Sequence, residues 1–459
     1  MTASHHIQSI NIVRLFGRYS YSFPASGNEL KGLNIIYGGN GLGKTTLLNL
    51  VFHLFSIGQG KTNLDFISKT AFESFKVTLN DSTTISASKD PQLLIGSVKF
   101  KIKIKGEPSQ EWEYIPGQQG IISPNDLPEG LDLSKISLRM RGEVKQVLNQ
   151  RSLLGLMNAL EAKTYMLTSD RIFLGDSTES STVNRITQDR VRLKVSELVV
   201  SYRNDAVSEA LHSTSRWLQE QFLDSSYGSN GATSNVYEDV IVKIATTQYT
   251  TKKGIGKGES EKIKEELLKD ITDINKKSVE YRELGLRRTN VSDLVYETVE
   301  NCTGNKLVLV DNVLRPYLAE LKERQRQIQP INDMIKQFVA AANRFFNDKK
   351  LVFNIISGLK IFVFHEKQIT EEEIKSEQLS SGEKQLIFIL CRVLTARGKT
   401  SIFIIDEPEI SLNITWQRML MSTLMELSQK SELQLIIASH SMEIIAQHSD
   451  RVVLLEDEK

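Results

Sequence analysis

The chain has 459 residues, enough for two or three domains, and its 40% hydrophobic and 25% charged content is typical of a globular protein. The formal net charge is +1, so any contact with nucleic acid would need a local basic patch. Cys302 and Cys391 lie far apart without a Cys-x-x-Cys motif, which indicates a reducing compartment and argues against a zinc site. The first residues lack the features of a signal peptide, and no apolar run has membrane-spanning length, so we expect a cytoplasmic protein without a membrane partner.

The N-terminal segment predicts two pairing strands followed by a buried one. Residues from Ile7 to Leu15 partly alternate between apolar and polar, and Tyr19 to Phe23 follows after a short break, which predicts a hairpin. Leu33 to Tyr37 is a short apolar run bounded by glycines, which predicts a buried strand.

A glycine-rich loop with the sequence Gly-Gly-Asn-Gly-Leu-Gly-Lys-Thr follows this strand directly, starting at Gly38. Such a loop can curl so that its backbone N–H groups point at a phosphate, while Lys44 reaches the β- and γ-phosphates and the Thr45 hydroxyl ligates Mg²⁺. The apolar run that follows predicts a helix whose N-terminus faces the phosphates. The predicted phosphate-binding residues are Gly38, Asn40, Gly41, Gly43, Lys44, Thr45 and Thr46.

Residues 73 to 115 have the alternation of antiparallel strands. One predicted strand carries Lys99, Lys101, Lys103 and Lys105 on a single face. Lysines spaced at roughly 7 Å could contact a phosphate backbone or an acidic partner. The more ordinary interpretation is a solvated sheet face on which lysine discourages aggregation.

The middle of the chain, from about Ser196 to Phe346, is predicted to be helical, because apolar residues recur there at steps of three and four. We expect a helix break at Pro330, where this recurrence changes phase. Two arrangements fit the pattern equally: helical hairpin arms, or a compact helical bundle. A helix of about 40 residues would span only roughly 60 Å, which excludes a chromosome-scale coiled coil.

The last part of the chain begins with two predicted strands, Leu351 to Ile356 and Leu359 to Phe364. The segment Leu379 to Gln385, with the sequence Leu-Ser-Ser-Gly-Glu-Lys-Gln, then precedes an apolar helix. Taken alone, this segment would be an ordinary helix cap.

Two more buried-type strands each end in chemically active residues. Ser401 to Ile405 leads into Asp406-Glu407-Pro408, which offers one carboxylate to hold Mg²⁺ and one to polarise an attacking water. The strand from Leu435 ends at His440. A histidine at a strand end is more often structural, but here it is the fourth element of an ordered set.

With these motifs in order, the chain resembles the ABC-type ATPases related to RecF, the SMC proteins and the double-strand-break-repair ATPases. The resemblance covers about residues 1 to 60 and 350 to 459. It implies an α/β fold: an ABC ATPase head with a P-loop mixed sheet, an antiparallel β lobe and a helical, coiled-coil-like insertion. We expect ATPase lobe I at 1–175, the helical insertion at 176–349 and ATPase lobe II at 350–459.

The resemblance also implies roles for individual residues. ATP would be sandwiched in a homodimer or higher homo-oligomer, between the loop of one subunit and the signature of the other, formed by Ser380, Ser381, Gly382 and Glu383. Mg²⁺ would be held by Thr45 and Asp406, and catalysis would rest on Glu407 and His440. The segment from Glu409 to Asn413 resembles the loop that crosses to the partner subunit. Candidates for the Q-loop are Gln146, Gln150 and the segment Tyr165 to Arg171.

Two differences from related ATPases narrow the range of functions that we expect for this chain. Ser381 and Glu383 differ from the transporter signature and are usual in the SMC-like branch. The related overcoming-lysogenization-defect proteins carry a nuclease domain after the ATPase, and we expect none here, so an effector protein, a nuclease or a toxin, would be separate. We therefore expect an ATPase subunit of a prokaryotic antiphage system of the PARIS or Septu kind. The alternatives are a RecF-like repair ATPase that clamps DNA, and an ATP-gated scaffold with slow turnover.

Overall fold

The computed structural model describes residues 5–24, 30, 32–57, 61–117, 155, 157, 163–168, 173–174, 195–226, 240, 257–285, 290–365, 368–397, 402–429 and 431–455. The chain is mixed α/β and divides into two compact units. Unit 1 comprises Met1–Arg203 together with Arg392–Lys459, and unit 2 comprises Asn204–Cys391. No helix among the described residues combines the length and apolar character needed to cross a bilayer. The division of the chain into lobe I, insertion and lobe II stays a prediction.

One sheet of unit 1 is almost entirely parallel, with the order β15-β3-β14-β13-β8-β9. Only β9 pairs antiparallel, with β8. The sheet's two central strands, β13 and β14, are buried along their whole length, which explains the apolar runs at 402–405 and 435–438. The bounds are β3 Leu33–Tyr37, β8 Thr164–Leu167, β9 Phe173–Leu174, β13 Ile402–Asp406, β14 Gln434–Ser439 and β15 Val452–Leu454. The strands predicted around residues 33–37, 401–405 and 435–439 are thus confirmed.

The second sheet of unit 1 is antiparallel throughout, with the order β2-β1-β4-β5-β6-β7. Along β6, buried and exposed residues alternate strictly, so one face packs on the core and the other meets water. The predicted hairpin and the predicted antiparallel region are confirmed. The bounds are β1 Ile7–Leu15, β2 Tyr19–Phe23, β4 Ser74–Leu79, β5 Thr84–Ser88, β6 Val98–Lys103 and β7 Gln110–Tyr114.

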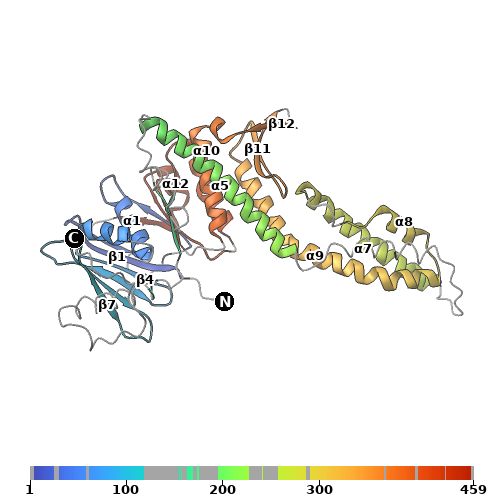
Figure 1. Cartoon of the computed structure of the whole chain (residues 1–459), viewed down its shortest axis with the longest axis horizontal. Helices are drawn as coiled ribbons and strands as arrows, with labels where there is room; N and C mark the ends of the chain where they lie inside the picture. The colour runs from blue at the N-terminus through green and yellow to red at the C-terminus, as the bar shows by residue number, and fades with distance from the viewer. Residues whose placement is uncertain are drawn as a thin grey trace, which may run out of the picture. The chain divides into compact units, whose positions relative to one another are not determined.

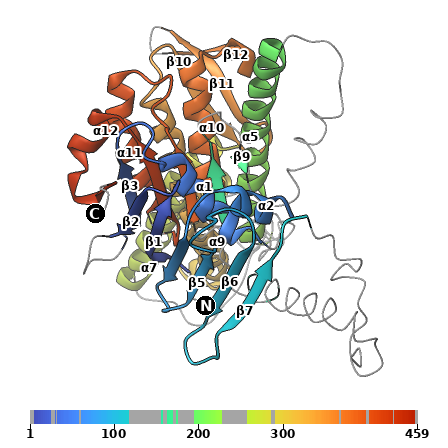
Figure 2. The ribbon, with the colours of Figure 1, turned by 90° about the vertical axis from the view of Figure 1, so that its left-hand side faces the viewer.

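Helix α1 (Lys44–Phe55) joins the two sheets of unit 1 into one core. Leu47, Leu50 and Val51 are fully buried in a cluster that contains side chains from both sheets. Burial of this helix on more than one side accounts for the apolar run that follows the glycine loop. Helix α2 (Lys61–Lys69) packs beside α1 (Figure 2), and α11 (Ile414–Ser428), α12 (Met442–Gln447) and a 3₁₀ turn (Ser449–Arg451) complete the unit.

Unit 2 is built from long helices and a small antiparallel sheet with the order β10-β11-β12. Strands β10 and β11 confirm the pair predicted at 351–364, and Figure 1 shows β11 beside β12. Its elements are α5 (Val195–Ser226, whose first turns belong to unit 1), α7 (Lys257–Glu283), α8 (Asp293–Asn301), α9 (Asn305–Asn343), β10 (Lys349–Asn354), β11 (Gly358–His365), β12 (Gln368–Ile374), a 3₁₀ turn (Ser376–Gln378) and the first part of α10 (Ser381–Ala396).

Helices α7 and α9 run in the same direction. Asp270 of α7 forms an ion pair with Lys322 of α9, and further along both helices Glu280 pairs with Lys336. The chain returns between them through α8, and the three helices share one apolar core. The two long helices are therefore not the two arms of a single hairpin, because a parallel pair needs a returning segment.

The helix break predicted at Pro330 is wrong. Helix α9 continues from Asn305 to Asn343 with both Pro316 and Pro330 inside it. Each proline removes one backbone N–H donor, which would end an isolated helix. Here Ile328 and Ile335, on either side of Pro330, are buried, so packing holds the helix together where local propensity disfavours it.

Candidate functional site

The glycine loop, the acidic pair and the histidine meet at one edge of the parallel sheet. Strand β14 lies between β3 and β13 and runs parallel to both, with Ser439 opposite Tyr37 and Ala438 opposite Asp406. The segments that follow the three strands therefore emerge side by side at the carboxyl edge, where open α/β sheets bind ligands. Three motifs far apart in the sequence form one site in unit 1.

The loop depends on glycine at two positions for different reasons. Gly43, the residue before α1, has φ +85°, and a Cβ atom there would lie 2.7 Å from Cδ2 of Leu15. Gly38 has room for no side chain because a Cβ would lie 2.9 Å from Cβ of Leu455. The backbone N–H groups at the start of α1 can therefore face a phosphate at close range.

Lys44 is held inside the loop. Its side chain is buried, and Nζ donates hydrogen bonds to the carbonyl oxygens of Gly38 at 2.8 Å and Gly39 at 3.1 Å. Asn40, Gly41 and Thr45 are exposed at the same end of the sheet, and Thr46 is half-buried. The arrangement places one cation and a set of backbone donors where an anion could enter.

Asp406 is a buried carboxyl group in contact with the loop. The Thr45 hydroxyl donates to its Oδ2 at 2.9 Å, and its Oδ1 is buried with no hydrogen-bond partner among the described residues. The pKa of Asp406 is raised to about 6, mainly by burial; the charges of Glu407 and Glu409 contribute to the rise, while the Thr45 bond and Lys44 oppose it.

The residues at this point suit a magnesium ion that arrives with a nucleotide. The free oxygen of Asp406 and the hydroxyl of Thr45 are the hard ligands that Mg²⁺ prefers. Among the described residues, no three His, Cys, Asp or Glu side chains could hold a metal ion by themselves. Nucleotide sites need no such cage, because phosphate oxygens and water complete the coordination.

Glu407 and His440 lie next to each other on the open side of the site. Glu407 has φ +50°, an uncommon conformation for a residue with a side chain, and its N–H donates to the carbonyl of Ala438 at 2.9 Å. Its Oε1 lies 3.6 Å from Nδ1 of His440, whose side chain is half exposed. The pair offers a general base and a second polar group to a substrate phosphate.

Glu409 is a further carboxylate of this site that the predicted set of site residues omits. It is buried, and its Oε1 accepts hydrogen bonds from the Ser439 hydroxyl and the His440 backbone N–H. The sequence offered one indication of Glu409, its position three residues after Asp406. By itself, an acidic residue at that position is not distinguishable from any polar residue in a turn.

The signature segment lies in unit 2 and forms a reciprocal helix cap. The N–H of Ser380 donates to Oε2 of Glu383, and the N–H of Glu383 donates to the Ser380 hydroxyl. Glu383 also pairs with Lys349 at 2.8 Å. Although burial alone would lower the pKa of Lys349, its hydrogen bond and ion pair with Glu383 raise it. Ser381 is exposed and Gly382 is buried. The role of this segment against a partner's nucleotide stays a prediction.

The predicted lysine face is smaller than expected. Lys99, Lys101 and Lys103 are exposed on β6, but Lys105 lies beyond the end of that strand, in the following turn. Acidic residues on β7 stand opposite two of these lysines: Lys101 pairs with Glu111 at 2.6 Å, and Lys99 is in register with Glu113. The basic character of the face is therefore partly neutralised.

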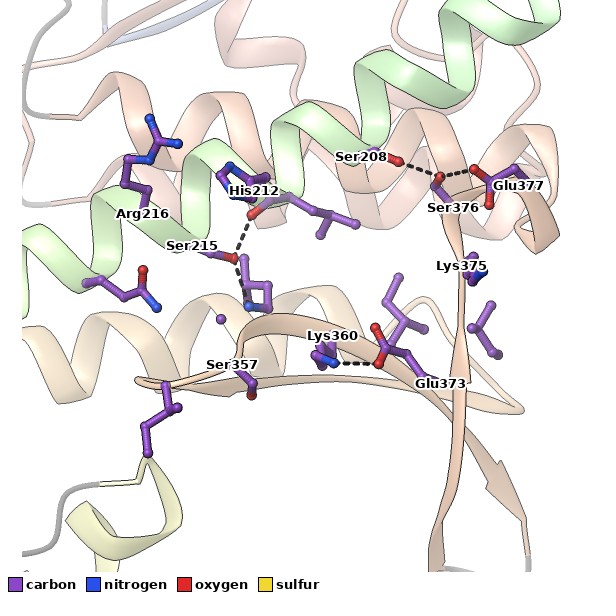
Figure 3. Close-up of a pocket in the computed structure, with 17 residues that line it drawn as sticks. Ser208, His212, Ser215, Arg216, Ser357, Lys360, Glu373, Lys375, Ser376 and Glu377 are labelled. Atoms are coloured by element: carbon purple, nitrogen blue, oxygen red, sulfur yellow. Dashed lines mark hydrogen bonds and ion pairs between the residues drawn. The ribbon is translucent and has the colours of Figure 1, made fainter.

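Unit 2 contains a polar pocket of about 560 Å³ between α5 and the strands β11 and β12 (Figure 3). Ser208 and Ser376 hydrogen-bond to each other at 2.6 Å on its wall, and Lys360 pairs there with Glu373 at 2.5 Å. The 3₁₀ turn that includes Ser376 lies just before the signature in the sequence. The Q-loop candidates Gln146 and Gln150 lie outside the described residues, and of Tyr165–Arg171 only residues 165–168 are described.

Comparison with known proteins identifies the type of domain. A family model described as "AAA domain, putative AbiEii toxin, Type IV TA system" matches residues 303–446. A putative ABC transporter ATP-binding protein of Methanosarcina acetivorans is 24% identical over 193 residues, 36% of this chain and 35% of that protein. A hemin import ATP-binding protein of Vibrio cholerae is 33% identical over 84 residues, 18% of this chain and 32% of that protein. The matches thus span about a third of the length of these curated relatives.

Among solved structures, the chain is similar to an Smc head domain with an extended coiled coil bound to the C-terminal domain of ScpA, from Pyrococcus furiosus. The identity is 13%, the coverage is 96% of this chain and 91% of that chain, and the TM-score is 0.34. An Smc head domain with a coiled coil and joint from Pyrococcus yayanosii gives 14% identity, 96% and 93% coverage, and a TM-score of 0.31. Scores this low do not establish a common fold. By its family match and its curated relatives, the chain is similar to ATP-binding domains of the AAA and ABC types.

Proposed function

We propose that the site at the carboxyl edge of the parallel sheet binds Mg²⁺·ATP and hydrolyses it. The observation that carries the proposal is the 2.9 Å hydrogen bond between Thr45 and Asp406, two residues 361 positions apart in the sequence. It brings the loop that would bind phosphate against a buried carboxylate with a free oxygen. This is the pairing that a magnesium nucleotide requires.

Each residue has a separate task in this proposal. Lys44 and the loop N–H groups bind the β- and γ-phosphates, and Asp406 and Thr45 would hold Mg²⁺, which would neutralise phosphate charge. Glu407 lies beyond Asp406 on the open side and accepts a proton from the attacking water. His440, at the end of the neighbouring strand, donates a hydrogen bond to the γ-phosphate.

The first test separates binding from hydrolysis. Lys44→Ala should weaken ATP binding, because it removes the cation inside the loop. Glu407→Gln should keep ATP affinity while lowering the hydrolysis rate by roughly 10²- to 10⁴-fold, because the general base is lost. Glu113→Gln, on the antiparallel sheet of the same unit, serves as the control. Hydrolysis by Glu407→Gln at the wild-type rate would disprove the assignment of the base.

At the level of the cell, we propose an ATPase subunit of an antiphage system that controls a separate effector protein. The description of the matching family, a putative toxin of a type IV toxin–antitoxin system, supports a two-component defence role. A homodimer closing on ATP through Ser380 and Gly382 would release or activate the effector. A DNA-clamping repair ATPase and a slow ATP-gated scaffold remain the alternatives.

Purification of the Glu407→Gln chain from its native operon distinguishes these roles. Because Glu407→Gln should hydrolyse ATP slowly, it should accumulate as the ATP-bound homodimer, and its partner should remain bound. A stoichiometric protein identified by mass spectrometry supports the effector role, whereas bound nucleic acid without a protein partner supports the repair clamp. Size-exclusion chromatography with and without ATP tests the predicted dimer, and a monomer under both conditions contradicts it.

A further inference from the structure

We infer that Glu409 is the positioning residue of His440. It fixes the backbone of residues 439–441, here called the histidine turn, and it keeps a hydrogen on Nδ1 of the histidine ring. The inference deepens the proposed ATPase and rests on it for its kinetic consequence, but its structural part can be tested without ATP. The observation that carries it is one buried carboxylate oxygen that accepts two hydrogen bonds from Ser439 and His440 and also lies 3.2 Å from the ring nitrogen Nδ1 of His440.

The three contacts come from Ser439, the last residue of β14, and from His440, which follows it. Oε1 of Glu409 lies 2.7 Å from the hydroxyl of Ser439, 2.8 Å from the backbone N of His440 and 3.2 Å from Nδ1 of the His440 ring. A single oxygen therefore contacts both the main chain and the side chain of the histidine. Rotation of the ring would break one of these contacts while the others remain.

Burial makes this carboxylate a rigid partner. The Glu409 side chain is 4% exposed, compared with 24% for Glu407 and 49% for His440. Taking a carboxylate out of water is unfavourable unless donors compensate it, and Oε2 of Glu409 has no partner among the described residues. The donors on Oε1 are thus the contacts that hold Glu409 where it is, and they hold the histidine turn in return.

The surrounding hydrogen bonds fix Glu409 and the histidine turn to the same support. Gln417 of α11 donates to the carbonyl of Leu412 at 2.9 Å and accepts from the Ser441 hydroxyl at 2.7 Å. Ser441 donates its backbone N–H to the Ser439 hydroxyl. The loop after Glu409 and the residues on both sides of His440 are therefore linked, so a shift of one moves the other.

The carboxylates also determine which ring nitrogen carries the hydrogen. Nδ1 of His440 has Glu409 Oε1 at 3.2 Å and Glu407 Oε1 at 3.6 Å, and ionised carboxylates only accept hydrogen bonds. Nδ1 must then be the donor, as in the carboxylate–histidine pairs that orient catalytic imidazoles. The other nitrogen, Nε2, is left for the substrate, and it donates to the γ-phosphate when the ring carries hydrogens on both nitrogens. Glu407 is needed for water activation, so the buried Glu409 is the partner that can remain bound to Nδ1 throughout turnover.

Kinetics of the full-length chain test the functional consequence. Glu409→Ala should lower kcat roughly 10- to 100-fold, as loss of a partner that orients a histidine does elsewhere, with KM for ATP within about twofold of wild type. Glu409→Gln keeps an acceptor oxygen and should restore most of the rate. Glu443→Gln, at a partly exposed acid of α12 that pairs with Arg418, is the matched control and should retain the wild-type rate.

A double-mutant cycle shows whether Glu409 acts through His440. In a His440→Ala background, Glu409→Ala should lower kcat by no more than about twofold. An equal loss in both backgrounds would overturn the inference, because Glu409 would then act independently of the histidine.

A measurement without nucleotide keeps the inference testable if Glu409→Ala does not fold or the chain does not hydrolyse ATP. In the wild-type chain labelled with ¹⁵N-histidine, the resonances lost in His440→Ala belong to this ring. A protonated Nδ1 supports the inference, and a neutral ring with its hydrogen on Nε2 contradicts it. If the wild-type chain binds no ATP, the proposed function fails, while this spectrum still reports on Glu409.

Discussion

The role proposed for Asp406 in magnesium binding conflicts with its burial in the folded chain without ligand. Magnesium binding needs its charged form, but its burial raises its pKa to about 6 from an ordinary 3.8. Because the folded chain binds this proton more tightly than the unfolded chain, the resulting stability is present at low pH and is lost as pH rises from about 4 through about 6. At neutral pH the buried charge therefore costs stability.

This conflict predicts that Asp406→Asn stabilises the chain. At pH 7, in the absence of ATP, the free energy of unfolding in urea should rise by about 1–3 kcal/mol, because the amide keeps the Thr45 bond without the buried charge. Near pH 4 the gain should disappear, since the aspartate is then neutral. Asp450→Asn, at an exposed acid, should change little at either pH. A destabilised Asp406→Asn chain at pH 7 would contradict the assigned cause.

Two glycines of the loop allow the stability cost of a left-handed backbone to be measured separately from the cost of steric crowding. Gly41 and Gly43 have nearly the same φ, +84° and +85°, but a Cβ at Gly41 meets no atom within 4 Å, whereas one at Gly43 meets Leu15. Gly41→Ala should cost about 1–2 kcal/mol of stability, the cost of a left-handed conformation. Gly43→Ala should cost more, because Leu15 must also move. Equal costs in urea unfolding without nucleotide would exclude a contribution from crowding.

At the scale of elements, Ser215 of α5 links a long helix to the small sheet of unit 2. Its hydroxyl accepts the N–H of Leu359 at 2.8 Å and donates to the carbonyl of Leu211 at 2.7 Å. Gly358, with φ +74°, brings the β11 backbone so close that a Cβ would lie 2.8 Å from the serine. The helix and the strand therefore meet through a backbone donor that has lost access to water.

Removal of that hydroxyl should be costly. Ser215→Ala leaves the buried N–H of Leu359 without its acceptor, which predicts a loss of about 1–3 kcal/mol in the free energy of unfolding. Ser213→Ala is the matched control, because among the described residues the Ser213 hydroxyl bonds to Ala210 of the same helix, and it should stay within about 0.5 kcal/mol of wild type. Similar losses for both variants would show that the bond to Leu359 is not important.

At the scale of the whole molecule, the exposed lysines of β6 remain the candidate contact surface for nucleic acid or an acidic partner. Glu111 and Glu113 on the neighbouring strand weaken their field. Replacing Lys99, Lys101, Lys103 and Lys105 with Glu should weaken such binding, with ATP affinity unchanged, because nucleotide binding depends on the other sheet. Replacing both glutamates with Lys should strengthen it. If neither variant changes DNA binding or co-purification, the face is only solvated.

The chain's local motifs could be predicted because their physical causes are local. Buried parallel strands need apolar runs, as in 402–405 and 435–438, and a phosphate loop needs glycines and a lysine at fixed spacing. Alternation along β6 similarly follows from one wet and one buried face. These features lie within about ten residues of sequence, so no knowledge of distant contacts was required.

The contacts that bring these motifs together into one site were decided only by the tertiary structure. The sequence by itself determined the strands, the glycine loop, the order of the motifs and the helical character of the middle. It did not show that Glu409 accepts a hydrogen bond from the backbone of His440, that α7 and α9 run parallel, or that α9 continues without a break at Pro330. The reason is physical: burial, strand register and packing join residues hundreds of positions apart, and they can override a local preference such as that of proline to end a helix.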